Sequence, residues 1–158
     1  MPGVLFVCLG NICRSPSAQA LFEDLLAIRN LDADVFVDSA GASDYHVGEP
    51  PCRIMQRAAR ARGIDMSAMR SRQVQPEDFR RFDYIFAMDR ANLDDLLWMA
   101  PPEHHHKISL FLAQAPDLGP DVPDPYYGGR DQAERVMDII EEGAQALLAH
   151  LLKTEICP

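Results

Sequence analysis

The chain has 158 residues, 47% of them hydrophobic and 25% charged, a balance typical of a soluble globular protein with one domain over residues 1–158. Its formal net charge of −9 argues against nucleic acid or an anionic membrane surface as a partner, because both require a basic surface. The chain has no apolar stretch near the ~20 residues of a membrane span and no signal-peptide pattern, so we expect no membrane insertion. Four cysteines, at positions 8, 13, 52 and 157, suit neither a disulfide scaffold nor a zinc site, and therefore indicate a reducing, cytoplasmic location.

Strand-like and helix-like patterns alternate along the chain. The predicted strands cover residues 4–7, 35–38, 84–88 and 108–112, and the predicted helices cover about 16–29, 51–62, 90–99 and 131–152. Such alternation predicts an α/β three-layer sandwich, in which a four-stranded parallel sheet has helices on both faces. Ligands bind beyond the carboxyl ends of such strands, and the loop after the first strand lies there.

That loop belongs to the segment CLGNICRSP, residues 8–16. Ser15 and Pro16 have the pattern of an N-cap followed by proline at the first helical position, so the residues before them form a tight loop. Gly10 and Asn11 are the residue types that most readily adopt a left-handed backbone, which a closed anion-binding loop requires. Inward-facing amides and a helix N-terminus would bind a tetrahedral oxyanion, and Arg14 would hold two of its oxygens.

Cys8 has two interpretations. A free cysteine is most often a small buried apolar side chain. Beside a helix N-terminus and Arg14, however, we expect Cys8 to be a thiolate at neutral pH and to attack phosphorus, forming a cysteinyl-phosphate that water then hydrolyses. The Ser15 hydroxyl is compatible with a second role as a hydrogen-bond partner of the sulfur.

The segment CLGNICRS at residues 8–15 resembles the signature loop of the low-molecular-weight protein tyrosine phosphatases. The resemblance covers nearly the whole chain, through DSAG at 38–41, FDYI at 82–85, MD at 88–89 and DPYYG at 124–128. It implies an enzyme that needs no metal or other cofactor, hydrolyses phosphotyrosine in proteins and releases inorganic phosphate. We expect a monomer.

The resemblance also implies roles for individual residues. Asp124, which in isolation is equally typical of a turn before proline, becomes the general acid for the leaving group and then the base for water. Asp89, most simply an N-cap, also lines the phosphate end of the pocket. The catalytic residues are thus Cys8, Arg14 and Asp124; the substrate-binding residues are Leu9, Gly10, Asn11, Ile12, Cys13, Ser15, Tyr45, Asp89, Tyr126 and Tyr127; and Ser39 supports the loop.

Substrate choice follows from the same residues. Apolar walls from Leu9 and the tyrosines at 45, 126 and 127 would enclose an aryl ring and reach phosphotyrosine better than the shorter phosphoserine. Ile12 stands where related arginine phosphatases carry threonine, which favours tyrosine. Cys13 either packs under the loop or, as the resemblance implies, forms a reversible disulfide that protects Cys8.

The chain departs from the family pattern at one position, and two other functions could use a loop of this kind. Many family members carry a histidine behind the loop where this chain has Ala68, which predicts an altered support there. An arsenate reductase would need a paired downstream cysteine relay, whereas Cys52 and Cys157 are far apart in sequence. A phosphate-binding module without activity would be expected to lack the nucleophile, the arginine or the acid, and all three are present.

Two further patterns favour ordinary structure. Residues 104–106 are three consecutive histidines without an acidic or cysteine partner at ligand spacing, so we expect no metal site there. Trp98 shares helical spacing with leucines at 93, 96 and 97 and is therefore predicted to pack in the core.

Overall fold

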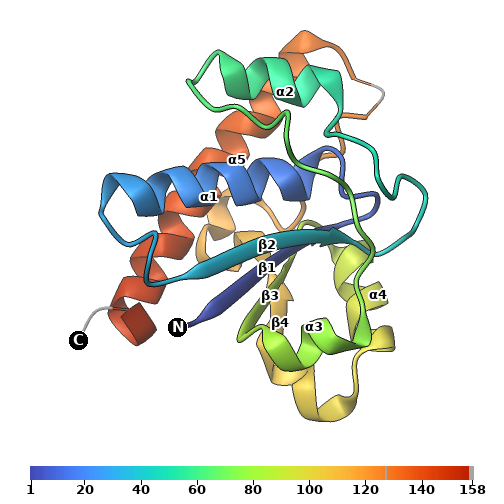
Figure 1. The fold of residues 1–158 in the computed structure, drawn as a ribbon, viewed down its shortest axis with the longest axis vertical. Helices are drawn as coiled ribbons and strands as arrows, with labels where there is room; N and C mark the ends of the chain where they lie inside the picture. The colour runs from blue at the N-terminus through green and yellow to red at the C-terminus, as the bar shows by residue number, and fades with distance from the viewer. Residues whose placement is uncertain (127, 157–158) are drawn as a thin grey trace.

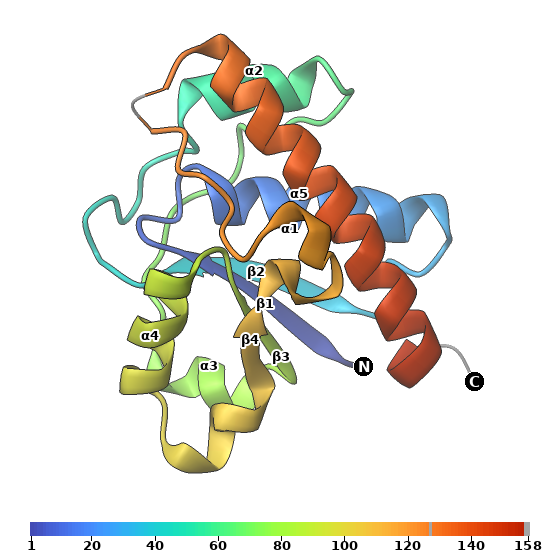
Figure 2. The ribbon, with the colours of Figure 1, turned by 180° about the vertical axis from the view of Figure 1, so that it is seen from behind.

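The computed structural model describes residues 1–126 and 128–156, which contain four parallel strands in the sheet order β2-β1-β3-β4. The strands are β1 (Gly3–Cys8), β2 (Phe36–Gly41), β3 (Tyr84–Ala87) and β4 (Ile108–Leu110). Helices α1 (Arg14–Ile28), α2 (Arg53–Arg60) and α5 (Arg130–Leu151) lie on one side of the sheet, and α3 (Pro76–Arg81) and α4 (Arg90–Met99) lie on the other (Figures 1 and 2). The predicted three-layer α/β class is confirmed.

Strand β1 forms the centre of the sheet and ends at the candidate site. It pairs with β2 on one side and β3 on the other, and all six of its residues are buried. Val4 and Phe6 point to the side of α1 and α5, whereas Leu5 and Val7 point to the side of α3 and α4. The Phe6 ring packs edge to face on Phe22 of α1, with ring centroids 5.6 Å apart. Packing on both faces therefore fixes the end of the strand.

The start of α1 differs from the prediction. The helix begins at Arg14 and Cys13 is its N-cap residue, so the expectation that Ser15 is the N-cap was wrong. Pro16 still lies in the first helical turn, where its missing amide removes no intrahelical hydrogen bond. The Ser15 hydroxyl is consequently free of a capping role and is available to the loop.

Two strand ends also differ. Strand β2 continues beyond the predicted end at 38, because residues 39–41 still pair with β1. Strand β4 ends at Leu110, and a 3-10 turn over Phe111–Gln114 follows it. Further 3-10 turns cover Pro102–Lys107 and Pro116–Leu118, and a π-helical turn over Leu152–Ile156 follows α5.

Two features of the helices were not predicted correctly. Helix α3 was missed; Gln75 and Asp78 form a capping box at its start. Trp98 was expected in the core but is 88% exposed, because α4 buries only Asn92 and Leu96 and turns Trp98 outward. Within residues 1–126 and 128–156, no helix is both long and apolar enough to cross a membrane.

Candidate active site

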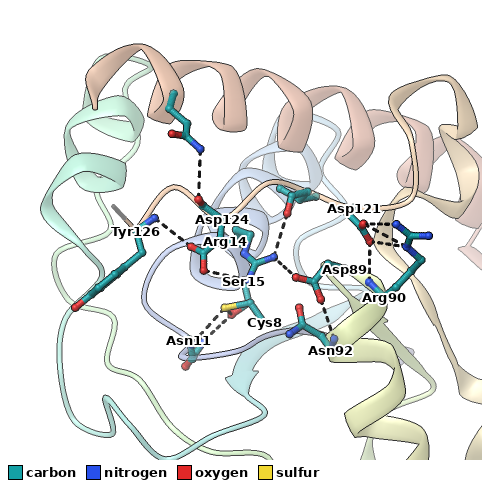
Figure 3. A network of polar contacts seen from close by, with 12 residues as sticks. Cys8, Asn11, Arg14, Ser15, Asp89, Arg90, Asn92, Asp121, Asp124 and Tyr126 are labelled. Atoms are coloured by element: carbon teal, nitrogen blue, oxygen red, sulfur yellow. Dashed lines mark hydrogen bonds and ion pairs between the residues drawn. The ribbon is translucent and has the colours of Figure 1, made fainter. Parts of the chain in front are cut away.

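The loop from Leu9 to Cys13 turns back over Cys8, the last residue of β1 (Figure 3). The Cys8 side chain is almost completely buried. Its sulfur accepts a hydrogen bond of 3.2 Å from the Asn11 amide and lies 3.0 Å from the Ser15 hydroxyl oxygen. The predicted contact between Ser15 and Cys8 is therefore present, and it fixes the sulfur at the base of the loop.

Asn11 holds the loop in its curved shape. Its φ of 57° is left-handed, as predicted, and asparagine tolerates this conformation. The side-chain nitrogen donates to the hydroxyl oxygens of Ser15 and Ser39 at 2.8 and 3.0 Å, and the side-chain oxygen accepts from the Arg72 amide at 3.0 Å. One buried amide thus joins the loop to α1, β2 and the segment before α3.

Gly10 has a different role from the one predicted. It does not have a positive φ, so the expected left-handed backbone at this position was wrong. Glycine is instead required by a close approach, because a Cβ here would lie 2.8 Å from Cδ2 of His46. The Gly10 carbonyl accepts a hydrogen bond of 2.9 Å from the Ser71 hydroxyl.

Ser71 and Arg72 support the loop from behind and were absent from the predicted site. Each lies 61 positions along the chain from the loop residue that it contacts, and no local pattern marks such a contact. The Arg72 side chain pairs with Asp78 at 2.9 Å and Asp38 at 3.0 Å. Burial opposes its charge, but these carboxylates outweigh that effect and raise the pKa of Arg72. The segment that follows Ala68 therefore supplies an anchored, charged support.

Arg14 is buried beside the sulfur and held by the fold. Its Nη1 donates to Asp89 Oδ2 at 2.6 Å and to the Val122 carbonyl at 3.0 Å (Figure 3). Burial lowers the pKa of Arg14, but the nearby Cys8 and the Asp89 carboxylate outweigh it and raise the pKa above its ordinary value. The guanidinium therefore remains a cation at neutral pH.

Two carboxylates lie near Arg14, and they differ in exposure. Asp89 is the N-cap of α4, as predicted, and accepts from the Asn92 amide at 2.8 Å. Asp124 is half-exposed, and its Oδ2 lies 3.7 Å from Nη2 of Arg14. Its Oδ1 accepts from the Tyr126 amide at 3.1 Å, which positions the carboxylate over the loop. Asp89 is thus a structural anchor, whereas Asp124 is open to a ligand.

A cavity of about 250 Å³ opens above the sulfur. It is lined by Cys8, Leu9, Gly10, Ile12, Cys13, Arg14, Tyr45, His46, Asp124 and Tyr126. Of the other predicted binding residues, Asn11, Ser15 and Asp89 do not line it but contact Cys8 or Arg14 from behind, and Tyr127 lies outside the described residues.

His46 lines the cavity but is absent from the predicted binding set. Its ring centroid lies 5.7 Å from that of Tyr126, and its Nδ1 lies 2.9 Å from a carboxylate oxygen of Glu49. The His46 ring also faces Gly10. His46 therefore connects both sides of the cavity entrance.

The histidine triplet lies apart from this cavity, in the 3-10 turn Pro102–Lys107. His105 makes a hydrogen bond of 3.0 Å between Nε2 and the Ala100 carbonyl. In the parts of the chain that the structure describes, no group of three or more His, Cys, Asp or Glu side chains is arranged to hold a metal ion.

The arrangement around Cys8 suits a cysteine-dependent phosphate-ester hydrolase, because the Cys8 sulfur lies beside a buried cation that can stabilise a transferring phosphoryl group. Comparison with known proteins gives the particular family. The model of the low molecular weight phosphotyrosine protein phosphatases matches residues 3–156, and this chain belongs to that family.

Individual relatives agree. The chain is 45% identical over 155 residues to the low molecular weight protein-tyrosine-phosphatase YfkJ of Bacillus subtilis, covering 97% of each chain. It is 43% identical over 135 residues to the human low molecular weight phosphotyrosine protein phosphatase, covering 84% of this chain and 85% of the human one. A crystal structure of protein tyrosine phosphatase from Entamoeba histolytica matches with a TM-score of 0.93 and 38% identity, over 97% of this chain and 98% of that one.

The predicted family and activity are confirmed by these matches. The protein is a phosphotyrosine-protein phosphatase of a cysteine-based, metal-independent family, whose members hydrolyse phosphotyrosine through a cysteinyl-phosphate. Its substrates are phosphotyrosine-containing proteins.

Proposed function

We propose that Cys8, Arg14 and Asp124 carry out this hydrolysis. The observation that carries the proposal is their meeting around one cavity, although Asp124 is more than 100 positions from the other two in the sequence. Cys8 attacks the phosphorus in line with the tyrosine oxygen, and the loop amides receive the phosphoryl oxygens. The product of this step is a phosphorylated Cys8 and a free tyrosine side chain.

Arg14 is suited to bind two phosphoryl oxygens at once. Among the described residues, the hydrogen bonds of its guanidinium all come from Nη1, to Asp89 and Val122. Nε and Nη2 therefore remain to donate to the phosphoryl group as a planar pair. Because the fold already holds Arg14 in place, little reorganisation accompanies the reaction.

Asp124 acts in both steps. Phenolate is a poor leaving group, so the Asp124 carboxyl donates a proton to the tyrosine oxygen as the bond to phosphorus breaks. The resulting carboxylate then accepts a proton from the water that attacks phosphorylated Cys8. The position of Asp124, half-exposed and near Nη2 of Arg14, supports this role.

The cavity walls favour an aryl phosphate. Leu9, Tyr45 and Tyr126 are 42%, 72% and 42% exposed, so apolar surface stands around the entrance while Cys8 lies at the base. A phosphotyrosine ring can occupy this entrance with its phosphoryl group at the sulfur, whereas phosphoserine is too short to contact both. The binding residues that we propose are the loop from Leu9 to Cys13, Ser15, Tyr45, Asp89, Tyr126 and Tyr127, with Ser39 in support.

We also propose that residues 1–158 form one domain that acts as a monomer in the cytoplasm. The family model spans nearly the whole chain, which supports a single unit. Cys8, Cys13 and Cys52 are free thiols, which suits a reducing compartment.

The test is release of phosphate from matched peptides that carry phosphotyrosine, phosphoserine or phosphoarginine, measured in parallel with EDTA present. We expect rapid release from the phosphotyrosine peptide alone, and none from Cys8→Ser, which keeps the loop but lacks the sulfur. The Cys8→Ser protein should still bind inorganic phosphate or vanadate. Substantial turnover by Cys8→Ser would remove Cys8 as the nucleophile, and a preference for phosphoarginine would overturn the assignment of the cavity walls.

A further inference from the structure

Two cysteines that the proposed mechanism does not use lie against each other beside the loop. Cys13 is the N-cap residue of α1, and Cys52 is the N-cap residue of α2. The Cys52 amide donates a hydrogen bond of 2.7 Å to the Ile12 carbonyl, so the start of α2 is held against the peptide that precedes Cys13. This backbone contact places the two thiols close enough for each to shift the pKa of the other.

Together with Cys8 they form a series from the cavity to the surface. Cys8 and Cys13 are 3% and 4% exposed, and both line the cavity above the loop. Cys52 is only partly buried and packs against the same apolar cluster from outside. Helix α2 lies at the outer side of the molecule (Figure 1), and Cys52, just before it, is the least buried thiol of this series.

The two paired thiols differ in acidity. The contact with Cys52 and burial both raise the pKa of Cys13 well above its ordinary value. The hydrogen bond from Cys13 lowers the pKa of Cys52, against the opposing effect of its own burial. Cys52 is also the less buried of the two, so it is the thiol of the pair that more readily becomes the attacking thiolate.

We propose that Cys52 is a resolving cysteine, which takes over the disulfide formed when a hydroperoxide oxidises Cys8 and presents it at the surface to a dithiol reductant. This inference rests on the proposed role of Cys8 as the nucleophile. It assigns to the chain a second activity, the reduction of hydroperoxides by dithiols.

Reduction of a hydroperoxide by this series takes four steps. The Cys8 thiolate attacks the hydroperoxide, which becomes an alcohol or, from hydrogen peroxide, water, and the Cys8 sulfur becomes a sulfenic acid. The Cys13 thiol attacks this sulfur, forms a disulfide with Cys8 and releases water. The Cys52 thiolate then attacks the Cys13 sulfur, forms the Cys13–Cys52 disulfide and expels the Cys8 thiolate. An external dithiol reduces that disulfide by two electrons and is itself oxidised to a disulfide.

This order of reaction steps has a consequence that a lasting Cys8–Cys13 disulfide would not have. Once the disulfide has moved to Cys13 and Cys52, Cys8 is a thiolate again although the protein carries two oxidised thiols. The oxidised protein should therefore still hydrolyse phosphotyrosine. Exchange at the partly exposed Cys52 also gives a dithiol easier access than the more buried Cys8 and Cys13.

The experiment exposes the wild type and Cys52→Ser to the same hydrogen peroxide concentration, followed by assays of phosphatase activity and disulfide mapping by mass spectrometry. The wild type should keep most of its activity and contain a Cys13–Cys52 disulfide. Cys52→Ser should be normally active beforehand, lose most of its activity with a Cys8–Cys13 disulfide, and recover it with dithiothreitol. Cys157→Ser is the matched control and should behave as the wild type.

Two outcomes would overturn the proposal. One is a wild-type disulfide that remains between Cys8 and Cys13, or that joins Cys8 to Cys157. The other is equal loss of activity in the wild type and Cys52→Ser. Steady consumption of peroxide with dithiothreitol should also be faster in the wild type than in Cys52→Ala, a second variant with a smaller side chain.

Cys8→Ser separates this inference from the proposed function. If that variant lacks phosphatase activity and the wild type still fails to form the Cys13–Cys52 disulfide, only the resolving role of Cys52 is wrong. If Cys8→Ser retains phosphatase activity, the nucleophile itself is wrong.

Discussion

Asp89 holds Arg14 with one carboxylate oxygen and begins helix α4 with the other. Oδ2 accepts from Arg14 Nη1 at 2.6 Å, while Oδ1 accepts from the Asn92 amide at 2.8 Å. The first turn of α4 and the Arg14 guanidinium therefore share one side chain. Because Arg14 is buried, this pairing both compensates its charge and orients it before a substrate arrives.

Substitution of Asp89 should separate these two roles. Asparagine is an effective N-cap, so Asp89→Asn should leave the melting temperature nearly unchanged. Loss of the charged partner should reduce kcat about 10- to 100-fold, because Arg14 is no longer held. Asp89→Ala should lose a similar factor in kcat and also about 1 kcal/mol of stability. Thermal denaturation and steady-state kinetics on both variants provide the check, and an unchanged kcat in Asp89→Asn would contradict a positioning role.

Arg14→Lys tests whether geometry or charge matters at this position. Lysine keeps the positive charge but cannot donate from a planar pair of nitrogens, so we expect kcat to fall about 10²- to 10³-fold. The matched control is Arg90→Lys, since Arg90 pairs with Asp121 at 3.0 Å but is 68% exposed. The kcat of Arg90→Lys should remain within about twofold of the wild-type value, because exposed ion pairs contribute little to the stability of a fold. Near-normal turnover by Arg14→Lys would argue against bidentate binding.

Asp124→Asn should reveal proton donation through its dependence on the leaving group. A phosphotyrosine peptide or phenyl phosphate needs a proton on the departing oxygen, so kcat should fall about 10²- to 10⁴-fold. An activated aryl phosphate such as p-nitrophenyl phosphate needs this proton much less, and its cleavage step should slow less. The measurement is the single-turnover rate of Asp124→Asn and of the wild type on each of the two substrates. Equal losses on both would indicate that Asp124 only shapes the loop.

The contact between Gly10 and His46 makes a prediction about the cavity entrance. Gly10→Ala should displace the His46 ring, because the new methyl group would lie 2.8 Å from Cδ2. The contacts of His46 with Tyr126 and Glu49 would then be lost, and KM for a phosphotyrosine peptide should rise several-fold. In the double variant Gly10→Ala/His46→Ala, the loss of binding free energy for the peptide should be smaller than the sum of the losses in the two single variants. The expected coupling free energy is about 0.5–3 kcal/mol. Simple additivity would mean that the displacement does not occur.

The parts of this protein that were predicted from sequence depend on local patterns. The alternation of strands and helices is visible because short apolar runs mark the buried strands, whereas a helical period marks helices that bury one face. The loop at 8–15 was predicted as the site because a candidate nucleophile, an arginine and a loop suited to bind phosphate lie in one short segment. Asp89 was likewise predicted as an N-cap, since the helix that it begins is adjacent in sequence.

The parts that were missed depend on contacts between distant segments. Ser71 and Arg72 reach the loop only because β2 and the segment before α3 lie beside it. The contact of Cys13 with Cys52 requires the start of α2 to pack on the loop, whereas the sequence only showed cysteines without paired spacing. Trp98 follows the helical period of its neighbours, yet only Asn92 and Leu96 of α4 are buried against the rest of the protein, and Trp98 lies outside that narrow face.

A glycine in helix α5 gives a final prediction in which packing and helix propensity have opposite signs. Alanine is intrinsically better than glycine inside a helix by about 1 kcal/mol, so propensity alone predicts that Gly143→Ala stabilises the protein. A Cβ at this position, however, would lie 2.7 Å from Cε2 of Phe111 and 2.8 Å from Cδ2 of Leu112. Both neighbours are only 1% exposed, so neither can turn its side chain out to solvent without losing its packing in the core. Overpacking of this kind costs about 1–3 kcal/mol.

We therefore expect Gly143→Ala to lower the melting temperature by a few degrees, since 1 kcal/mol corresponds to about 2–4 °C in a protein near this size. The matched control is Gln145→Ala on the exposed face of α5. This substitution should change the melting temperature by less than about 1 °C. Phe111→Leu should partly relieve the clash, so the double variant should lose less stability than the two single losses add up to. A higher melting temperature for Gly143→Ala would show that helix propensity outweighs the close approach of α5 to the turn after β4.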